Sequence, residues 1–348
     1  MIKITKLNEK ADVYDITVED NHNFYANNML VHNCLEITLP TKHLNDVNDV
    51  NGEIALCTLS AFNLGQLESL DELEELSDLV VRSLDNLLDY QNYPIQAAKK
   101  NKDRRTLGVG VTNLAYYLAK NGVKYSDGSA NELMHKTMEA FQYYLLKASN
   151  NLAKEIGECK LFNETNYANG LLPIDTYKKE VDSLGDFKYE KDWEQLRKDI
   201  KKYGLRNSTL SAQMPCESSS QVTNSTNGIE PPRGLISIKQ SKDGILKQVV
   251  PEYKNLKNDY ELLWSMPNNK GYLDIVSIMQ KFIDQSISTN TNYDPSKFSD
   301  GKIPIKQVLQ DILYAYRLGL KTLYYHNTRD NADDTEEDDG CSSGACKL

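Results

Sequence analysis

The sequence predicts an α/β protein with a small all-β segment at its amino-terminal end. From residue 34 onward, strand-like apolar runs are separated by amphipathic helical patterns, and this order favours parallel strands in a barrel or an open sheet. Residues 1–33 contain only short β-type pieces. A chain of 348 residues is long enough for one large domain or two.

Composition excludes several classes of protein. The 50 acidic residues outnumber the 40 basic ones, and a net charge of −10 argues against a surface that coats nucleic acid. No apolar run approaches the roughly 20 residues of a membrane helix, and the first residues lack the apolar core of a signal peptide. Six cysteines are too few for a disulfide scaffold, so we expect reduced thiols and a cytoplasmic protein. Their spacing predicts no zinc site, and no metal site is expected.

The amino-terminal segment is expected to form short strands. Alternating patterns predict strands at 2–7 and 11–18, and further β pieces at 24–25 and 29–31. Fewer than about 40 residues cannot bury a core alone, so this segment needs a partner.

Strands and helices then alternate along the rest of the chain. Ser69 and Glu72 form a capping box at the start of one helix, and Gly157 is suited to end another. The glycine-bearing strand at 107–111 is not a dinucleotide fingerprint, because no third glycine opens a helix. Strands are predicted at 35–40, 54–60, 107–111, 208–214 and 320–325, and helices at 69–88, 132–156, 193–203 (charged and exposed) and 306–318.

The stretch around the Asn33–Cys34 bond suits two kinds of chemistry. A His-Asn pair followed directly by a thiol is the arrangement that breaks a peptide bond by asparagine cyclisation. In an extended segment, Cys34 and Glu36 would project on the same side. The residues before this bond resemble the carboxyl-terminal piece of a split intein, with matching blocks at 13–18, 22–25 and 30–33.

The intein resemblance implies a role for each polar residue of the segment. Cys34 would accept the upstream protein segment as a thioester, and Asn33 would cyclise to release the intein. His32 would donate to the scissile carbonyl or the leaving group, while His22 and Asp15 would assist both steps. Because Met1 has the character of a true start, we expect splicing in trans with a separate upstream half. The alternative is a β-hairpin with incidental histidines.

The remainder resembles the large subunit of class I ribonucleotide reductase. Eight blocks occur in the family's order and spacing: 34–37, 56–59, 104–108, 206–209, 215–219, 227–234, Tyr324-Tyr325 and Cys341…Cys346. The resemblance implies the carboxyl-terminal part of a ten-stranded α/β barrel whose finger loop carries the radical cysteine. The chain would then divide into the intein segment at 1–33, the barrel part at 34–330, and a flexible acidic tail with a redox cysteine pair at 331–348.

The reductase resemblance also assigns the central chemistry. Cys34 would be the thiyl radical that removes the ribose 3′ hydrogen. Glu36 would take the 3′-hydroxyl proton and help to expel the 2′-hydroxyl as water. Cys57 would be one of the two thiols that reduce the sugar, and its partner would lie in the upstream half. Asn33 is not the family's substrate asparagine, because it belongs to the intein.

The outer parts of the machinery follow in the same way. Tyr324 and Tyr325 would relay the radical from the small subunit, and Cys341 and Cys346 would re-reduce the active-site disulfide before passing the oxidation to thioredoxin or glutaredoxin. The substrate phosphates would bind hydroxyl and backbone N–H groups of one segment at a helix N-terminus: Pro215, Cys216, Glu217, Ser218 and Ser219. Cys216 departs from the family, which has a small or hydroxyl residue there, and a thiol is a weaker donor.

No cofactor is expected in this chain, since the radical would come from a dinuclear metal and tyrosyl centre of the small subunit. Allosteric nucleotides would bind the upstream half, and the assembled protein would form a homodimer that binds neither nucleic acid nor membrane. Two alternatives are half-subunits that associate without splicing and a non-catalytic binding subunit of the same fold. Taken singly, Cys57 could be a core residue, the tyrosines packing residues, and the tail cysteines a metal site. The substrate's phosphorylation state stays open.

Overall fold

A computed structural model describes residues 23–26, 29–32, 35–241, 244–329 and 338–339. The helices are α1 (Glu72–Tyr90), α2 (Gln96–Lys99), α3 (Asn101–Arg104), α4 (Leu114–Lys120), α5 (Asn131–Ile156), α6 (Pro173–Thr176), α7 (Trp193–Tyr203), α8 (Glu217–Val222), α9 (Tyr253–Leu256), α10 (Lys270–Gln280) and α11 (Ile305–Arg317). The strands are β1 (Asn23–Ala26), β2 (Met29–His32), β3 (Thr58–Asn63), β4 (Leu107–Thr112), β5 (Ile236–Ser241), β6 (Gly244–Val249), β7 (Thr291–Tyr293), β8 (His326–Thr328) and β9 (Asp338–Asp339).

Parallel pairing connects the segments that carry the site. β3 pairs with β4 in a register that runs from Thr58↔Leu107 to Asn63↔Thr112, and β7 pairs with β8. Single bridges, Val109↔Ser211 and Gln213↔Ile287, join these pairs through the extended segments 208–214 and 285–288. The predicted parallel arrangement is therefore confirmed. Within the described residues this arrangement is open, and no closed barrel is formed.

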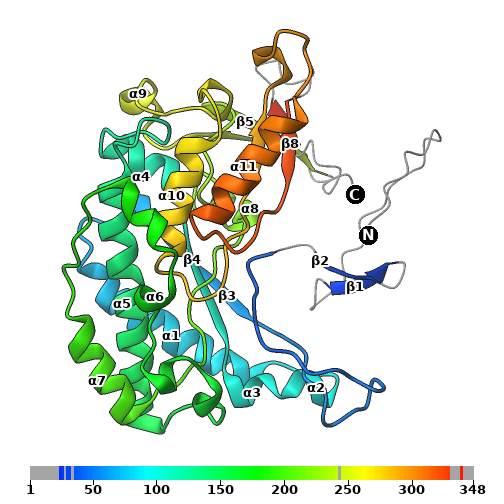
Figure 1. Cartoon of the computed structure of the whole chain (residues 1–348), viewed down its shortest axis with the longest axis vertical. Coiled ribbons are helices and arrows are strands. Elements are labelled where there is room, and N and C mark those ends of the chain that lie inside the picture. Colours follow the sequence, from blue (N-terminus) through cyan, green and yellow to red (C-terminus); the bar gives the residue numbers. More distant parts are fainter. Residues whose placement is uncertain (1–22, 27–28, 33–34, 242–243, 330–337, 340–348) are drawn as a thin grey trace.

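Helices connect the parallel segments and cover one side of them. Along the chain, α1 links β3 to β4, and α11 links β7 to β8. Helices α5 and α7 belong to the connection from β4 to segment 208–214. In Figure 1, α1, α5 and α7 lie on one side of β3 and β4, and the segment 35–57 lies on the other. The long helix α5 contacts α1, α7 and α10, so its apolar residues form the centre of the core. Segment 35–57, on the opposite side of the strands, contains Glu36 and Cys57, two of the residues with predicted chemistry.

The start of α1 shows why the sequence pattern predicts this helix well. The Glu72 carboxylate accepts from the backbone N–H of Ser69 at 2.8 Å, which is one half of the predicted capping box. The other half is missing, because the Ser69 hydroxyl accepts from the Asp71 N–H instead. Along α1, Val81 is buried in the core, whereas Leu87 is 47% exposed.

Several predicted boundaries are wrong. Segment 35–40 is extended but is not a strand, because side chains of Ser288 and Gln285 meet its backbone N–H groups in place of a neighbouring strand. The strand expected at 54–60 begins at Thr58, and the strand expected at 320–325 is displaced to β8, at 326–328. α7 is not exposed all round: Trp193, Leu196 and Ile200 are buried.

Other elements gave no clear signal in the sequence. The short helices α2, α3 and α4, the buried helix α10 and the β5–β6 hairpin were not predicted. The antiparallel β1–β2 pair confirms the β character of 24–25 and 29–31. The strands expected at 2–7 and 11–18 lie outside the described residues. In the part of the chain that the structure describes, no helix is both long and apolar enough to span a membrane.

Candidate active site

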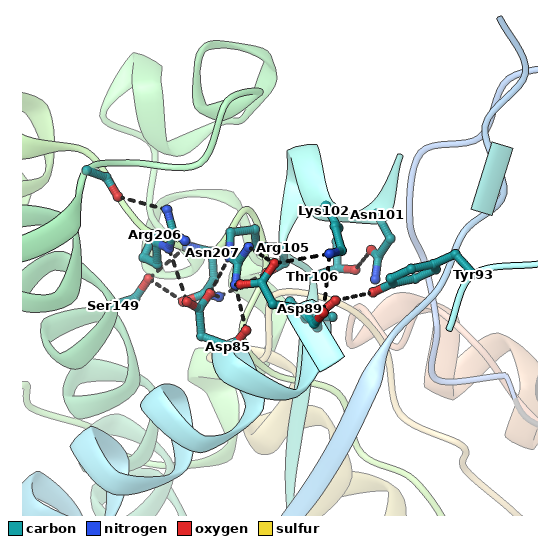
Figure 2. Close-up of polar contacts among 12 residues, drawn as sticks. Asp85, Asp89, Tyr93, Asn101, Lys102, Arg105, Thr106, Ser149, Arg206 and Asn207 are labelled. Carbon is teal, nitrogen blue, oxygen red and sulfur yellow. Dashed lines mark hydrogen bonds and ion pairs between the residues drawn. The ribbon is translucent and has the colours of Figure 1, made fainter. Parts of the chain in front are cut away.

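A buried polar network fixes the starts of the parallel strands (Figure 2). Arg105, whose backbone lies in the left-handed region at φ 53°, donates to Asp85 of α1 at 2.5 Å. Asn207 donates both to the same carboxylate, at 3.1 Å, and to the Arg105 carbonyl, at 3.0 Å. The blocks 104–108 and 206–209 therefore tie β4 and segment 208–214 to α1. Their role in this structure is architectural.

The same network reaches the residue before Cys57. The Thr106 hydroxyl donates to the Leu56 carbonyl, which fixes the backbone at the start of β3. On the inner side, Gln285 Nε2 lies 3.6 Å from Cys57 Sγ and donates to the Leu107 carbonyl at 2.9 Å. Desolvation raises the pKa of the Cys57 thiol to about 12, with further contributions from the Asp284 and Glu36 charges, so this thiol stays protonated near neutral pH.

Gly108 leaves the space that the Cys57 sulfur occupies. A Cβ added to Gly108 would lie 2.6 Å from Cys57 Sγ, well inside ordinary contact distance. β4 is buried along its whole length, so its backbone cannot move away from Cys57 easily. The sequence Leu107-Gly108-Val109 is thus a condition for placing the thiol.

Glu36 lies buried beside segment 285–288. Its carboxylate accepts from the Ser288 hydroxyl at 2.5 Å, and its backbone carbonyl accepts from the Ser286 N–H at 3.0 Å. Only 1% of the residue is exposed. The carboxylate lies within electrostatic reach of two thiols, because the Glu36 charge contributes to raising the pKa of both Cys57 and Cys216. A buried carboxylate beside thiols is suited to proton transfer.

The predicted phosphate-binding segment opens a short helix. Cys216 is the N-cap residue of α8, as expected, and its backbone N–H donates to Asn227 Oδ1 at 3.0 Å. Its buried sulfur lies 3.7 Å from the Met214 carbonyl and 3.8 Å from that of Val111. Desolvation raises the pKa of this thiol. The other members of the segment are exposed: Pro215, Glu217, Ser218 and Ser219.

The two predicted relay tyrosines touch each other. The Tyr324 hydroxyl donates to the Tyr325 hydroxyl at 2.8 Å, and the ring centroids are 3.8 Å apart. Their backbones lie against segment 289–291, since the Tyr324 N–H donates to the Thr289 carbonyl at 2.7 Å. Tyr325 is 37% exposed. The pair therefore extends from the inner strands to the surface of the described chain.

Comparison with known proteins identifies this arrangement. The family model described as "Ribonucleotide reductase, barrel domain" matches residues 13–326. The chain belongs to the ribonucleotide reductase family. It is 70% identical over 318 residues to the ribonucleoside-diphosphate reductase subunit alpha of Haemophilus influenzae, and 68% identical over 323 residues to the ribonucleoside-diphosphate reductase 1 subunit alpha of Escherichia coli. Each alignment covers 90% of this chain and 42% of the relative, so the chain spans less than half the length of these relatives.

A phage relative gives a more distant comparison within the ribonucleotide reductase family. The subunit alpha of Enterobacteria phage T4 is 51% identical over 279 residues, which are 78% of this chain and 36% of that protein. The family membership confirms the class of protein to which the reductase resemblance pointed. It leaves the individual residue roles as predictions.

Several predicted site residues lie outside the described residues: Asp15, His22, Asn33, Cys34, Cys341 and Cys346. Only the backbone of His32 is described, as the last residue of β2. The expectation that Cys34 and Glu36 project on the same side of the chain therefore stays a prediction. Among the residues that the structure describes, no group of three or more His, Cys, Asp or Glu side chains is arranged to hold a metal ion.

Sequence reasoning missed the polar residues that hold the site from segment 285–290. Ser288 binds Glu36, Gln285 approaches Cys57, and Asn290 binds the Tyr325 backbone. The stretch Gln285-Ser286-Ile287-Ser288-Thr289-Asn290 alternates polar and apolar residues only weakly, so it was not predicted as a strand.

Proposed function

We propose that this chain supplies the carboxyl-terminal catalytic part of a class I ribonucleotide reductase large subunit, which reduces ribonucleotides to deoxyribonucleotides. The buried Glu36 carboxylate, within electrostatic reach of the Cys57 and Cys216 thiols, is the observation that carries the proposal. Identity of 70% to a ribonucleoside-diphosphate reductase subunit alpha supports it and favours a diphosphate substrate.

Each residue then has a balanced part in the reaction. The Cys34 thiyl takes the 3′ hydrogen atom and becomes a thiol, and Glu36 accepts the 3′-hydroxyl proton. The 2′-hydroxyl leaves as water after it gains a proton from a thiol. Cys57 and a second thiol of the upstream half supply two electrons and end as a disulfide, and their second proton goes to C2′. Glu36 returns its proton to the 3′ oxygen, and the hydrogen atom returns from Cys34 to C3′, which restores the thiyl. The high pKa of Cys57 suits a thiol that must keep its proton until this step.

Partners complete the proposed cycle. The small subunit would supply the radical through Tyr325 and Tyr324, whose hydroxyls are 2.8 Å apart. Cys341 and Cys346 would reduce the disulfide by thiol exchange and would be re-reduced by thioredoxin or glutaredoxin. The exposed segment 215–219 would bind the substrate phosphates. The upstream half would add the remaining strands of a ten-stranded barrel and the sites for allosteric nucleotides.

We further propose that residues 1–33 form the carboxyl-terminal segment of a split intein. The support is the succession of Asp15, His22, His32 and Asn33 before Cys34. The reductase family model begins at residue 13, inside this segment, so the boundary at 33/34 rests on the splicing motif alone. Cys34 would serve twice, first as acyl acceptor and later as radical carrier.

Co-expression of this chain with an upstream half that ends in an amino-terminal intein segment tests the splicing proposal. We expect intact-mass spectrometry to show a ligated product that lacks residues 1–33. Asn33→Ala should block release of the intein while leaving the fold of the reductase part intact. Two unligated chains with full reductase activity would instead support half-subunits that associate without splicing.

The reductase proposal is tested on the assembled enzyme with its small subunit and a thiol reductant. Glu36→Gln should lower the rate of deoxyribonucleotide formation by at least about 100-fold, the low end of what general acid–base catalysis contributes. Cys57→Ser should also abolish turnover, because no disulfide can then form. Unchanged turnover in both variants would favour a non-catalytic binding subunit of the same fold.

A further inference from the structure

The hydrogen bonds around the tyrosine pair lead to a carboxylate that the proposed reaction does not use. The Tyr325 N–H donates to Asn290 Oδ1 at 3.0 Å, whereas the N–H of its neighbour Tyr324 donates to a backbone carbonyl. The Asn290 side-chain amide thus takes the place of the backbone carbonyl that a neighbouring strand would provide. The position of Tyr325 therefore depends on what holds the Asn290 side chain.

Glu230 holds it. Asn290 Nδ2 donates to Glu230 Oε1 at 2.6 Å, which fixes which end of the amide faces Tyr325. Burial raises the pKa of Glu230, while the bond from Asn290 and the charge of Arg233 act in the opposite direction. The Glu230 carboxylate thus accepts from one end of the Asn290 amide, and the other end of that amide accepts from the Tyr325 N–H.

Glu230 belongs to the same loop that supports the phosphate-binding segment. Three residues before it, Asn227 accepts from the Cys216 N–H at 3.0 Å and donates to Glu217 Oε1 at 3.1 Å. One loop, 227–230, therefore contacts both the segment 215–219 and, through Asn290, the backbone of Tyr325.

We propose that Asn290 and Glu230 form a positioning pair for Tyr325, an inference that rests on the proposed reductase function. The pair fixes the Tyr325 backbone, and with it the 2.8 Å contact between the two hydroxyls. Neither residue touches the reacting atoms. A displacement of about 1 Å at a transferring group can cost on the order of 100-fold in rate, so a lost backbone bond should appear in turnover.

Exchange of donor and acceptor between the two residues provides the test. Asn290→Asp places a second carboxylate against Glu230 and should lower kcat of the assembled enzyme at least ten-fold, with KM for the nucleotide within two-fold. In Asn290→Asp combined with Glu230→Gln, the introduced aspartate accepts from both the Tyr325 N–H and the new amide. The double variant should regain kcat to within about three-fold of the wild type.

A matched control separates this role from the loss of any buried amide bond. Asn150 of α5 is a buried amide whose Nδ2 donates to two backbone carbonyls, those of Asp199 and Gly204. Asn150→Ala should lower the melting temperature and leave kcat per folded enzyme unchanged. If Asn290→Asp does not fold, Asn290→Ala takes its place, and it should lower kcat at least ten-fold relative to Asn150→Ala.

The outcomes distinguish the two proposals. Wild-type enzyme without any turnover would overturn the proposed function itself. Active wild type with unchanged kcat in Asn290→Asp, or a double variant as slow as the single one, would overturn the positioning role and leave the reductase proposal standing.

Discussion

Two thiols, Cys57 and Cys216, lie within electrostatic reach of Glu36, and burial raises the pKa of both. A thiol with a raised pKa is a poor nucleophile and metal ligand but keeps its hydrogen. The proposed mechanism needs this property at Cys57 and gives Cys216 no redox role. The two residues can therefore be separated by substitution.

We expect Cys216→Ser to retain activity. A serine hydroxyl can donate to the Met214 or Val111 carbonyl at least as well as the thiol, which lies 3.7 and 3.8 Å from them. Steady-state kinetics of the assembled enzyme should give kcat and KM within about three-fold of the wild type. A loss as large as that of Cys57→Ser would instead give Cys216 a direct part in the thiol chemistry.

His135 makes stability depend on pH. Its ring stacks on Phe187 at 4.5 Å, and burial together with the Lys281 charge lowers its pKa from 6.5 to about 4, against the opposing charge of Asp182. Because the pKa is lower in the folded state, the stabilisation is fully present above pH 6.5 and is lost as the pH falls toward 4.

Chemical denaturation should show this loss. Between pH 7 and pH 4.5, the free energy of unfolding of the wild type should fall by about 2 kcal/mol more than that of His135→Phe. The phenylalanine can keep the stacking on Phe187 but cannot titrate. Parallel curves for the two proteins would contradict the lowered pKa.

Residue types in the sequence indicated the reactive groups but not their supports. Glu36, Cys57 and the tyrosine pair were predicted because their chemistry needs those residue types in family order. Ser288, Gln285 and Asn290 were missed, since serines and amides occur everywhere and their use depends on contacts between residues far apart in the sequence. These contacts span 252 residues for Ser288, 228 for Gln285, and 35 and 60 for Asn290. Such contacts arise only from the tertiary fold.

At the scale of elements, the strand starts are held by charge as well as by ladder bonds. Asp85 of α1 binds Arg105, Arg206 and Asn207, which belong to the starts of two neighbouring parallel segments.

Helices α1, α5 and α7 were predicted with bounds close to those observed, because their apolar periodicity and end signals are local. Segment 35–40 was wrongly predicted as a strand, because its Leu35 and Thr38 N–H groups donate to side chains and not to a neighbouring strand.

The fit between β3 and β4 leads to a prediction for Gly108→Ala. The added methyl group would lie 2.6 Å from both Cys57 Sγ and Leu59 Cδ2, so overpacking should cost about 1–3 kcal/mol of unfolding free energy. Cys57 should also move and react faster with an alkylating reagent.

The matched control is Gly122→Ala, because Gly122 has φ +67° and open space around it. This variant should be destabilised by backbone strain without any change at Cys57. Equal alkylation rates in both variants would show that Gly108 does not position the thiol.

At the scale of the whole molecule, the described strands form an open arrangement that the sequence could not distinguish from a barrel. Alternating strands and helices predict parallel neighbours, but closure depends on strands that pair with the two outer edges. One edge is β3, whose sole strand partner among the described residues is β4. Relatives of more than twice this length leave room for a further set of strands.

Amide hydrogen exchange can show whether the upstream half covers this edge. In this chain alone, the amides of β3 (58–63) that point away from β4 should exchange quickly, because no ladder bond protects them. Those of β4 should exchange slowly, because segment 208–214 bonds its other edge. After the upstream half is added, the β3 amides should become protected while β4 changes little. If β3 exchanges equally fast in the assembled protein, the upstream half does not extend the sheet at this edge, and the proposal of a barrel completed there is wrong.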